Sequence, residues 1–269
     1  MNSYIKIYIC ALVKLGKSNA IKTRDVRQPA FLCGLSTTDQ PASHSTAVYD
    51  PFEGFNRGVY AFNERADKAI LEPAANGYRA ITTPPIRAGV SNFLTHLNEP
   101  IVFTNALLQG KPTAAIDTAA RFLVNSTLGV GGFLDPATAW NVPKHDEDFG
   151  QTLGIWGIDN GPYLVLPFMG GSNLRDVFSM GFDAAINPIN YANFEGDSLF
   201  RGSTAIAGAV ATRERLSAAI EVLREQPEPY IALRRNYTQQ RAAAIRDGRE
   251  QDDPFQDLPE FDAYEFGDE

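Results

Sequence analysis

The residues that could do chemistry in this chain are few and widely spaced. A hydrolase of the serine type needs a nucleophile, a base and a group that orients the base. The chain has three histidines, His44, His96 and His145, and its Gly171-Ser172-Asn173 run lacks the G-x-S-x-G pattern of a nucleophile elbow. Ser172 is better explained by a turn that enters a helix. The set favours binding or transport over catalysis.

The sequence gives little support for a metal site or a phosphate-binding site either. The acidic run Asp146-Glu147-Asp148 could collect a cation, but it lacks the EF-hand spacing, and an exposed charge run is the commoner explanation. Both cysteines, Cys10 and Cys33, lie near the N-terminus, so the body has no cysteine-based metal site. The glycine-rich run at 129–132 is not followed by Gly-Lys-Ser/Thr, so it is not a phosphate loop. We expect no metal and no cofactor.

Charge is distributed unevenly along the chain. The formal net charge is −8, yet residues 250–269 alone hold nine acidic side chains and no basic one. The rest of the chain is therefore nearly neutral and has no dominant basic patch, which argues against nucleic acid as a partner. Residues 249–269 are predicted to form a disordered acidic tail.

Residues 1–46 are predicted to be a leader or signal segment followed by a polar linker. The apolar run Tyr4–Leu15 resembles a short secretory segment. Cys33 is the candidate lipid anchor. The residues before it, Phe31 and Leu32, are bulkier than those that ordinarily precede an acylated cysteine. An unmodified cysteine, or a different start of the chain, is the alternative.

The elements that must position any site are mainly helices, because apolar residues recur every three or four positions. The first helix is expected to have Asp50 as its N-cap and to end at Pro73. The long helix that follows residue 200 is expected to be capped by Ser203. The predicted helices span 50–73, 90–97, 101–108, 112–128, 173–187, 203–227 and 229–248. In the last one, the side chains expected to point outward are Arg234, Arg235, Arg241 and Arg246.

The segment Ile101–Leu108 is apolar on nearly all sides. Such a helix is either buried in a core or in contact with lipid. No apolar run in the chain reaches the roughly 18 residues that a membrane-spanning helix needs. In a soluble protein the core is the better explanation for this segment.

Residues 145–176 form the most unusual stretch. Glycines recur too often for a stable helix, and the apolar residues between them are too many for a solvated loop. We expect an irregular segment held by packing, with glycines where the backbone approaches another element closely.

An ordered series of motifs resembles the MlaA (VacJ) family over residues 49–247. The motifs are Asp50-Pro51-Phe52-Glu53-Gly54-Phe55-Asn56-Arg57, Tyr60-x-Phe62-Asn63, Asn92-Phe93, Glu99-Pro100, Leu108-Gln109-Gly110, Arg121-Phe122-x-x-Asn125, Leu128-Gly129-x-Gly131-Gly132-Phe133-x-Asp135, Phe149-Gly150-x-Thr152-Leu153-Gly154, Gly161-Pro162-Tyr163, Leu166-Pro167-Phe168, Arg175-Asp176 and Pro229-Tyr230.

The resemblance implies a mainly α fold. It would be a single ring-like helical domain, here residues 49–248, lying in one membrane leaflet with irregular Gly/Pro-rich segments. It further implies an outer-membrane lipoprotein, associated with the periplasmic leaflet, whose channel removes misplaced phospholipids from the outer leaflet. The implied partners are phospholipids, trimeric porins and a periplasmic lipid-carrier protein. A lipid needs a passage rather than a nucleophile, which agrees with the missing catalytic set.

The candidates for the lipid path are polar or small residues within apolar helices and the loop that follows them. They are Asn105, Asn125, Ser126, Gly129, Gly131 and Gly132. Helix capping and turn formation are the alternative roles for these residues. Two other functions stay open at this stage, a lipid-acting hydrolase that uses His145 or Ser172, and a soluble periplasmic scaffold or binding protein.

Overall fold

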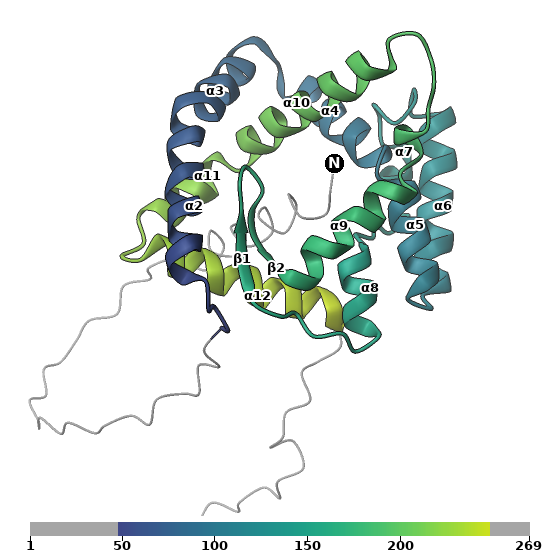
Figure 1. Cartoon of the computed structure of the whole chain (residues 1–269). Coiled ribbons are helices and arrows are strands. Elements are labelled where there is room, and N and C mark those ends of the chain that lie inside the picture. Colours follow the sequence, from purple (N-terminus) through teal and green to yellow (C-terminus); the bar gives the residue numbers. More distant parts are fainter. Residues whose placement is uncertain (1–47, 248–269) are drawn as a thin grey trace, which may run out of the picture.

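The helices of the chain follow one another around a ring (Figure 1), and a short β-hairpin is the only sheet in the part of the chain described here. The computed structural model describes residues 48–247. The elements, in chain order, are α2 (Glu53–Ala66), the π-helix η1 (Asp67–Leu71), α3 (Glu72–Ile81), α4 (Pro84–His96), α5 (Glu99–Leu108), α6 (Pro112–Thr127), α7 (Pro136–Ala139), α8 (Phe149–Ile155), β1 (Tyr163–Leu166), β2 (Gly170–Asn173), α9 (Leu174–Ile186), the 3-10 helix η2 (Pro188–Asn190), α10 (Asp197–Arg215), α11 (Ser217–Arg224) and α12 (Pro229–Arg246).

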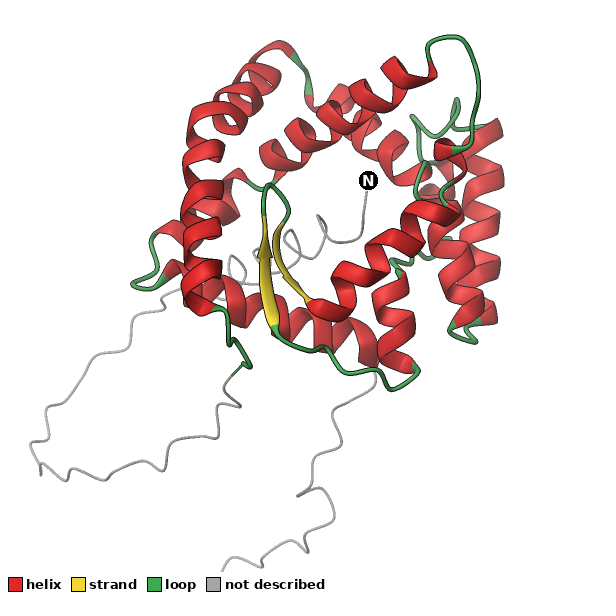
Figure 2. Cartoon of the chain, viewed as in Figure 1, coloured by secondary structure: helices red, strands yellow, loops and turns green. Residues whose placement is uncertain are grey.

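Contacts between the elements close the ring. Helix α3 packs on α10, α10 on α4, α4 on α6, and α6 on α5. The circuit continues from α5 to α8, from α8 to α12, and from α12 through the hairpin back to α2. Figure 2 shows the hairpin in yellow among the red helices, with its turn directed away from α12. The mainly helical, ring-like fold expected from the sequence is therefore confirmed.

Several predicted helix boundaries are wrong. Asp50 does not cap α2, because Phe52 holds that position and the Asp50 carboxylate accepts hydrogen bonds from Asn56 and Arg234 instead. Pro73 does not end the first helix. It lies at the start of α3, directly after the π-helix η1, and the chain stays helical from 53 to 81.

Corrections also apply to three other helices. Helix α4 already begins at Pro84 rather than near residue 90, and Ser203 lies inside α10, which starts after Gly196 in a left-handed conformation. The predicted helix 203–227 is two helices, because the chain breaks at Leu216. The N-terminal end of α9 is as expected, with the Asn173 side chain accepting a hydrogen bond from the Asp176 N–H.

The glycine-rich stretch contains a helix that the sequence argued against. Residues Phe149–Ile155 form α8 despite two glycines, because close packing there needs them. A Cβ at Gly150 would lie 2.2 Å from Nη2 of Arg241, and one at Gly154 would lie 2.7 Å from Ile245. The helix propensity that glycine loses is offset by the contacts that it permits.

The distribution of side chains is unusual for a chain of this size. Among the described residues, buried polar and charged side chains outnumber buried hydrophobic ones. The buried hydrophobic residues form three small clusters, around Leu216 and Leu233, around Tyr163 and Tyr237, and around Ala106 and Ala115. The ring is thus joined largely by polar contacts between its helices.

Some sequence expectations concern residues outside the described range. The leader and linker at 1–46, the cysteines Cys10 and Cys33, and the acidic tail at 249–269 all lie there.

Candidate functional site

Exposed apolar side chains mark one part of the ring. They occur on every helix from α2 to α6 and on α9 and α10. Within the helical elements, the most exposed are Phe55, Ile70, Ile81, Ile116, Leu123, Phe178, Leu199 and Ile206. Helices α11 and α12 have no large hydrophobic side chain that is exposed. The molecule therefore has an apolar part and a polar part.

Helix α5 is among the shortest of these apolar elements. It has 10 residues, about 15 Å at the rise of an α-helix, which is about half of a ~30 Å hydrocarbon core. Ile101, Val102 and Ala106 are buried, whereas Leu107 is 53% exposed. One face of the helix therefore belongs to the core and the other lies at the surface. No helix among residues 48–247 combines the length and the apolar character needed to cross a membrane.

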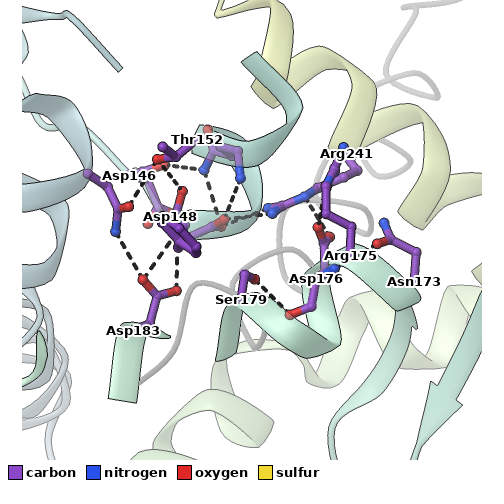
Figure 3. A network of polar contacts seen from close by, with 12 residues as sticks. Asp146, Asp148, Thr152, Asn173, Arg175, Asp176, Ser179, Asp183 and Arg241 are labelled. Atoms are coloured by element: carbon purple, nitrogen blue, oxygen red, sulfur yellow. Dashed lines mark hydrogen bonds and ion pairs between the residues drawn. The ribbon is translucent and has the colours of Figure 1, made fainter. Parts of the chain in front are cut away.

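A buried ion-pair network joins α12 of the polar part to α8 and α9, and we call it the α8–α9–α12 joint (Figure 3). Arg241 of α12 donates from Nη1 and Nη2 to the two carboxylate oxygens of Asp148, at 2.7 and 2.6 Å. Its Nε lies 2.6 Å from Oδ2 of Asp176 at the start of α9. All three side chains are almost completely buried. Two predictions are therefore wrong. Arg241 does not point outward, and Glu147 and Asp148 of the acidic run are buried.

The joint is extended by groups that satisfy its remaining acceptors. Tyr237 donates its hydroxyl hydrogen to Asp176 and accepts a hydrogen bond from Asn173. Asp148 also caps α8 by accepting the Gln151 N–H. Burial raises the pKa of the Asp148 carboxyl, but the Arg241 guanidinium outweighs burial and holds that pKa below its usual value. Asp148 is therefore ionised and paired.

Asp183 of α9 lies at the edge of this joint. Its carboxylate accepts hydrogen bonds from Asn105 of α5 at 3.0 Å and from the Phe149 N–H. Burial, together with the nearby charge of Asp148, raises the pKa of Asp183 to about 7. The α5, α8 and α9 elements thus meet at a carboxyl group that titrates near neutral pH.

The hairpin is held to α2 by two asparagine side chains. The Asn56 amide donates to the Tyr163 carbonyl at 3.0 Å and accepts from the Val165 N–H at 2.9 Å. Asn63 repeats this pairing with the Leu166 carbonyl and the Phe168 N–H, both at 2.9 Å. Seven helical residues advance about 10.5 Å, which matches three strand residues. The two amides therefore replace the neighbouring strand that β1 lacks.

The turn of the hairpin lies against the ring wall. Phe168 has φ 62° and is 66% exposed, and its ring contacts Phe62 with centroids 5.3 Å apart. Behind the turn is a pocket of about 110 Å³ between α2, η1, α10 and α11. Its apolar lining includes Leu71, Met169, Leu216 and Ile220. We call this the turn pocket.

Comparison with known proteins identifies the family. The model of the MlaA lipoprotein family matches residues 48–244. The chain belongs to the MlaA family. An intermembrane phospholipid transport system lipoprotein MlaA of Escherichia coli K12 is 37% identical over 215 residues, which cover 77% of this chain and 80% of that protein. An uncharacterized protein of Rickettsia typhi is 38% identical over 200 residues, or 74% of this chain and 79% of that one.

A solved structure agrees with this assignment. It comes from work on the structural basis for maintenance of bacterial outer membrane lipid asymmetry. The two chains superpose with a TM-score of 0.65 at 33% identity, over 73% of this chain and 98% of the other. The ring is thus a fold that this chain shares with an MlaA-like protein.

The MlaA-like motifs of the sequence lie where the ring is joined. The motif that begins at Asp50 supplies Asn56, and Asp50 itself accepts a hydrogen bond from Tyr230 of the Pro229-Tyr230 motif. The motif that begins at Phe149 forms α8 of the joint. The motif sequences alone did not reveal these roles, although two asparagines seven residues apart, and therefore on one face of a helix, were a detectable signal.

The structure separates the predicted lipid-path residues into two places. Asn105 is fully buried, donates to Asp183 and accepts a hydrogen bond from Thr152, so it joins α5 to α8 and α9. Asn125 is buried, donates to Asp135 and accepts the Ala137 N–H. Both amides hold elements together in this structure, and their part in a lipid path stays a prediction.

Ser126 and the three glycines lie at the end of α6. The Ser126 hydroxyl is 3.1 Å from Nε2 of His96, and a Cβ at Gly132 would lie 2.3 Å from that imidazole. Gly129 is equally confined, since an added Cβ would lie 2.5 Å from the Asn125 carbonyl oxygen. Gly131 has φ 66° and nothing within 4 Å of the Cβ position. The loop is thus tight at two glycines and open at the third.

The residues proposed for a hydrolase are engaged elsewhere. Ser172 is buried in β2 and its hydroxyl donates to the Asn173 carbonyl. His145 pairs with Asp117 of α6 at 2.9 Å. Ser172 and His145 thus bond to different partners, and the structure does not bring these two residues together as nucleophile and base.

Proposed function

We propose that this chain carries phospholipid between membranes as a component of the outer membrane. It would lie in the periplasmic leaflet with its apolar helices among acyl chains, and phospholipid would pass through the interior of the ring beside the hairpin turn. The observation that carries the proposal is the division between exposed apolar side chains on α2–α6, α9 and α10 and their absence from α11 and α12. Helices about one leaflet long can bury one face in lipid without spanning it.

The division also gives the ring an orientation. Helices α11 and α12 would face the aqueous periplasm, because they expose charged side chains such as Glu221 and Arg235 and no large hydrophobic one. A periplasmic lipid-carrier protein would receive lipid on this polar side. Trimeric porins would contact the apolar side within the membrane. The relatives named for intermembrane phospholipid transport support the transport role itself.

Lipid anchorage through Cys33 is part of the proposal. Acylation would hold the ring at the leaflet that its short helices can occupy. Metabolic labelling with a radioactive fatty acid should mark the intact protein and leave the Cys33→Ala variant unlabelled. Equal labelling of both would remove Cys33 from the proposal and leave the ring's own apolar helices as the membrane contact.

The lipid path is proposed to include the surface of the loop after α6. Val130 in this loop is 73% exposed and Gly131 has open space beside it. Ser126, Gly129 and Gly132 would shape the loop from behind, Asn125 would hold it through Asp135, and Asn105 would keep α5 in place beside it.

The test of transport is the amount of phospholipid exposed on the cell surface. Added phospholipase should release more lipid product from cells that lack this chain, and expression of the intact gene should reverse the increase. An unchanged release in a strain without redundant pathways would contradict the proposal. It would favour a periplasmic scaffold, which should also be soluble without detergent, in contrast to a ring with exposed apolar helices.

A further inference from the structure

The turn pocket is separate from the α8–α9–α12 joint. It lies where three features meet, the π-helix η1, the hairpin turn, and the break between α10 and α11 at Leu216. A π-helix within an α-helix is rare and is found frequently at functional sites. Here it interrupts an otherwise continuous helix from residue 53 to residue 81, at the level of the pocket.

We propose that the turn pocket binds one acyl chain of the phospholipid that the ring carries. This inference rests on the proposed function and adds a defined subsite to it. The lining is largely apolar, with Leu71 from η1, Met169 from the turn, and Leu216 and Ile220 from the α10–α11 region. An apolar cavity of about 150 Å³ is known to stay dry and to bind small hydrocarbons. A pocket of about 110 Å³ that opens at one side is suited to a segment of alkyl chain.

The charged groups around the pocket indicate which part of the phospholipid, the acyl chain or the head group, can bind there. Asp67 accepts from Arg213 at 2.7 Å and from Arg224 at 2.7 Å. Glu72 lies 3.3 Å from Arg213 and 3.0 Å from Arg224, and Glu64 lies 3.0 Å from Arg224. Both guanidinium groups are thus already paired with carboxylates. The wall therefore offers a phosphate no uncommitted cation, and the favourable occupant is apolar.

The entrance to the pocket is also apolar. Phe168 stands exposed at the turn, with Phe62 against its ring. Asn63 holds the backbone at the end of β1 and within the turn, so this wall is set before a ligand arrives. A chain that entered here would cover Phe168 and leave its head group in the interior of the ring. A preformed site of this kind loses little conformational entropy on binding.

The test uses Ala209, which lines the pocket from α10. Ala209→Trp fills the pocket, and Ala207→Trp adds the same bulk at an exposed position of the same helix. The full-length protein in nanodiscs is irradiated with phosphatidylethanolamine that carries a diazirine on one acyl chain. We expect adducts on Met169, Leu216 or Ile220 in the original chain and in Ala207→Trp, and at least a tenfold loss in Ala209→Trp. Circular dichroism and the thermal transition verify that both variants fold.

Further probes separate the alternatives. A phosphatidylethanolamine with the diazirine on its head group should give no adduct in the pocket. Labelling by this probe, or labelling by a diazirine fatty acid alone and not by the acyl-labelled phospholipid, would overturn the assignment. Adducts that persist in folded Ala209→Trp would overturn it as well. If the original chain clears surface phospholipid and Ala209→Trp clears it equally well, the subsite fails while transport stands. If the original chain does not clear surface phospholipid, transport itself fails.

Discussion

The α8–α9–α12 joint and the hairpin turn use polar side chains in opposite ways. In the joint, Arg241 is buried between Asp148 and Asp176, and each charge is compensated by another. At the turn, Asn63 satisfies only the backbone, and the side chains of Phe168 and Met169 are left to face the pocket or solvent. The comparison shows that one region is closed by paired charges, whereas the other leaves apolar side chains uncovered.

Loss of the Arg241 side chain should have the largest effect. Arg241→Ala leaves the buried Asp148 carboxylate without its cation and Asp176 with Arg175 alone, and breaking a buried ion pair in this way costs about 3–5 kcal/mol. The free energy of unfolding, measured by urea titration of the purified protein, should fall by about this amount. Arg235→Ala, at an exposed position of the same helix, should change it by less than about 0.5 kcal/mol. Equal effects of the two substitutions would show that the joint does not stabilise the ring.

A smaller loss should follow from Gly150→Ala, because the added methyl group meets Arg241 and Asp176. Overpacking of this kind costs about 1–3 kcal/mol. Gly181→Ala is the matched control, since Gly181 lies within α9 with nothing near its Cβ position and should gain up to about 1 kcal/mol. A Gly150→Ala protein as stable as the original would contradict the close approach of α8 and α12.

Removal of the asparagine amides should loosen the hairpin without unfolding the ring. Asn56→Ala leaves two buried backbone groups of β1 without partners, at about 1–3 kcal/mol. Hydrogen exchange followed by mass spectrometry should show faster exchange in residues 163–173 and unchanged exchange in α12. Gln239→Ala, on the exposed face of α12, serves as the control. Hairpin protection that survived both Asn56→Ala and Asn63→Ala would exclude the pairing with α2.

The smallest effect concerns pH. The pKa of Asp183 is about 7 in the folded protein, against an ordinary value of 3.8. A raised pKa means that the folded state binds the proton more tightly, so this contribution to stability is present at low pH and is lost as the pH rises through about 7. As the pH is raised from 5 to 8, the temperature of the thermal transition should decrease in the original chain and stay more nearly constant in Asp183→Asn. Parallel pH profiles would remove Asp183 from this role.

Periodicity was sufficient for the helices and the family resemblance for the ring, but neither was sufficient for its joints. Periodicity and prolines located most helices, because those signals are local. The outward placement of Arg241 failed because a charged side chain on a helix is ordinarily solvated, and its partners lie 93 and 65 positions earlier in the chain. The glycines of α8 misled for the same reason, since they allow the helix to approach Arg241 and Ile245 of α12, far along the chain. The two motif asparagines of α2 were visible, but their partners exist only once the hairpin has formed.

The central claim is that phospholipid contacts the hairpin turn inside the ring, and photo-crosslinking in living cells tests it most directly. A benzophenone amino acid is placed at Phe168 of the turn, at Phe178 on the apolar part, or at Glu221 on α11, in cells whose phospholipids carry radioactive phosphate. The account predicts phospholipid adducts at positions 168 and 178 and none at 221. Adducts at 178 without any at 168 would place the protein in the membrane but contradict a lipid path beside the turn.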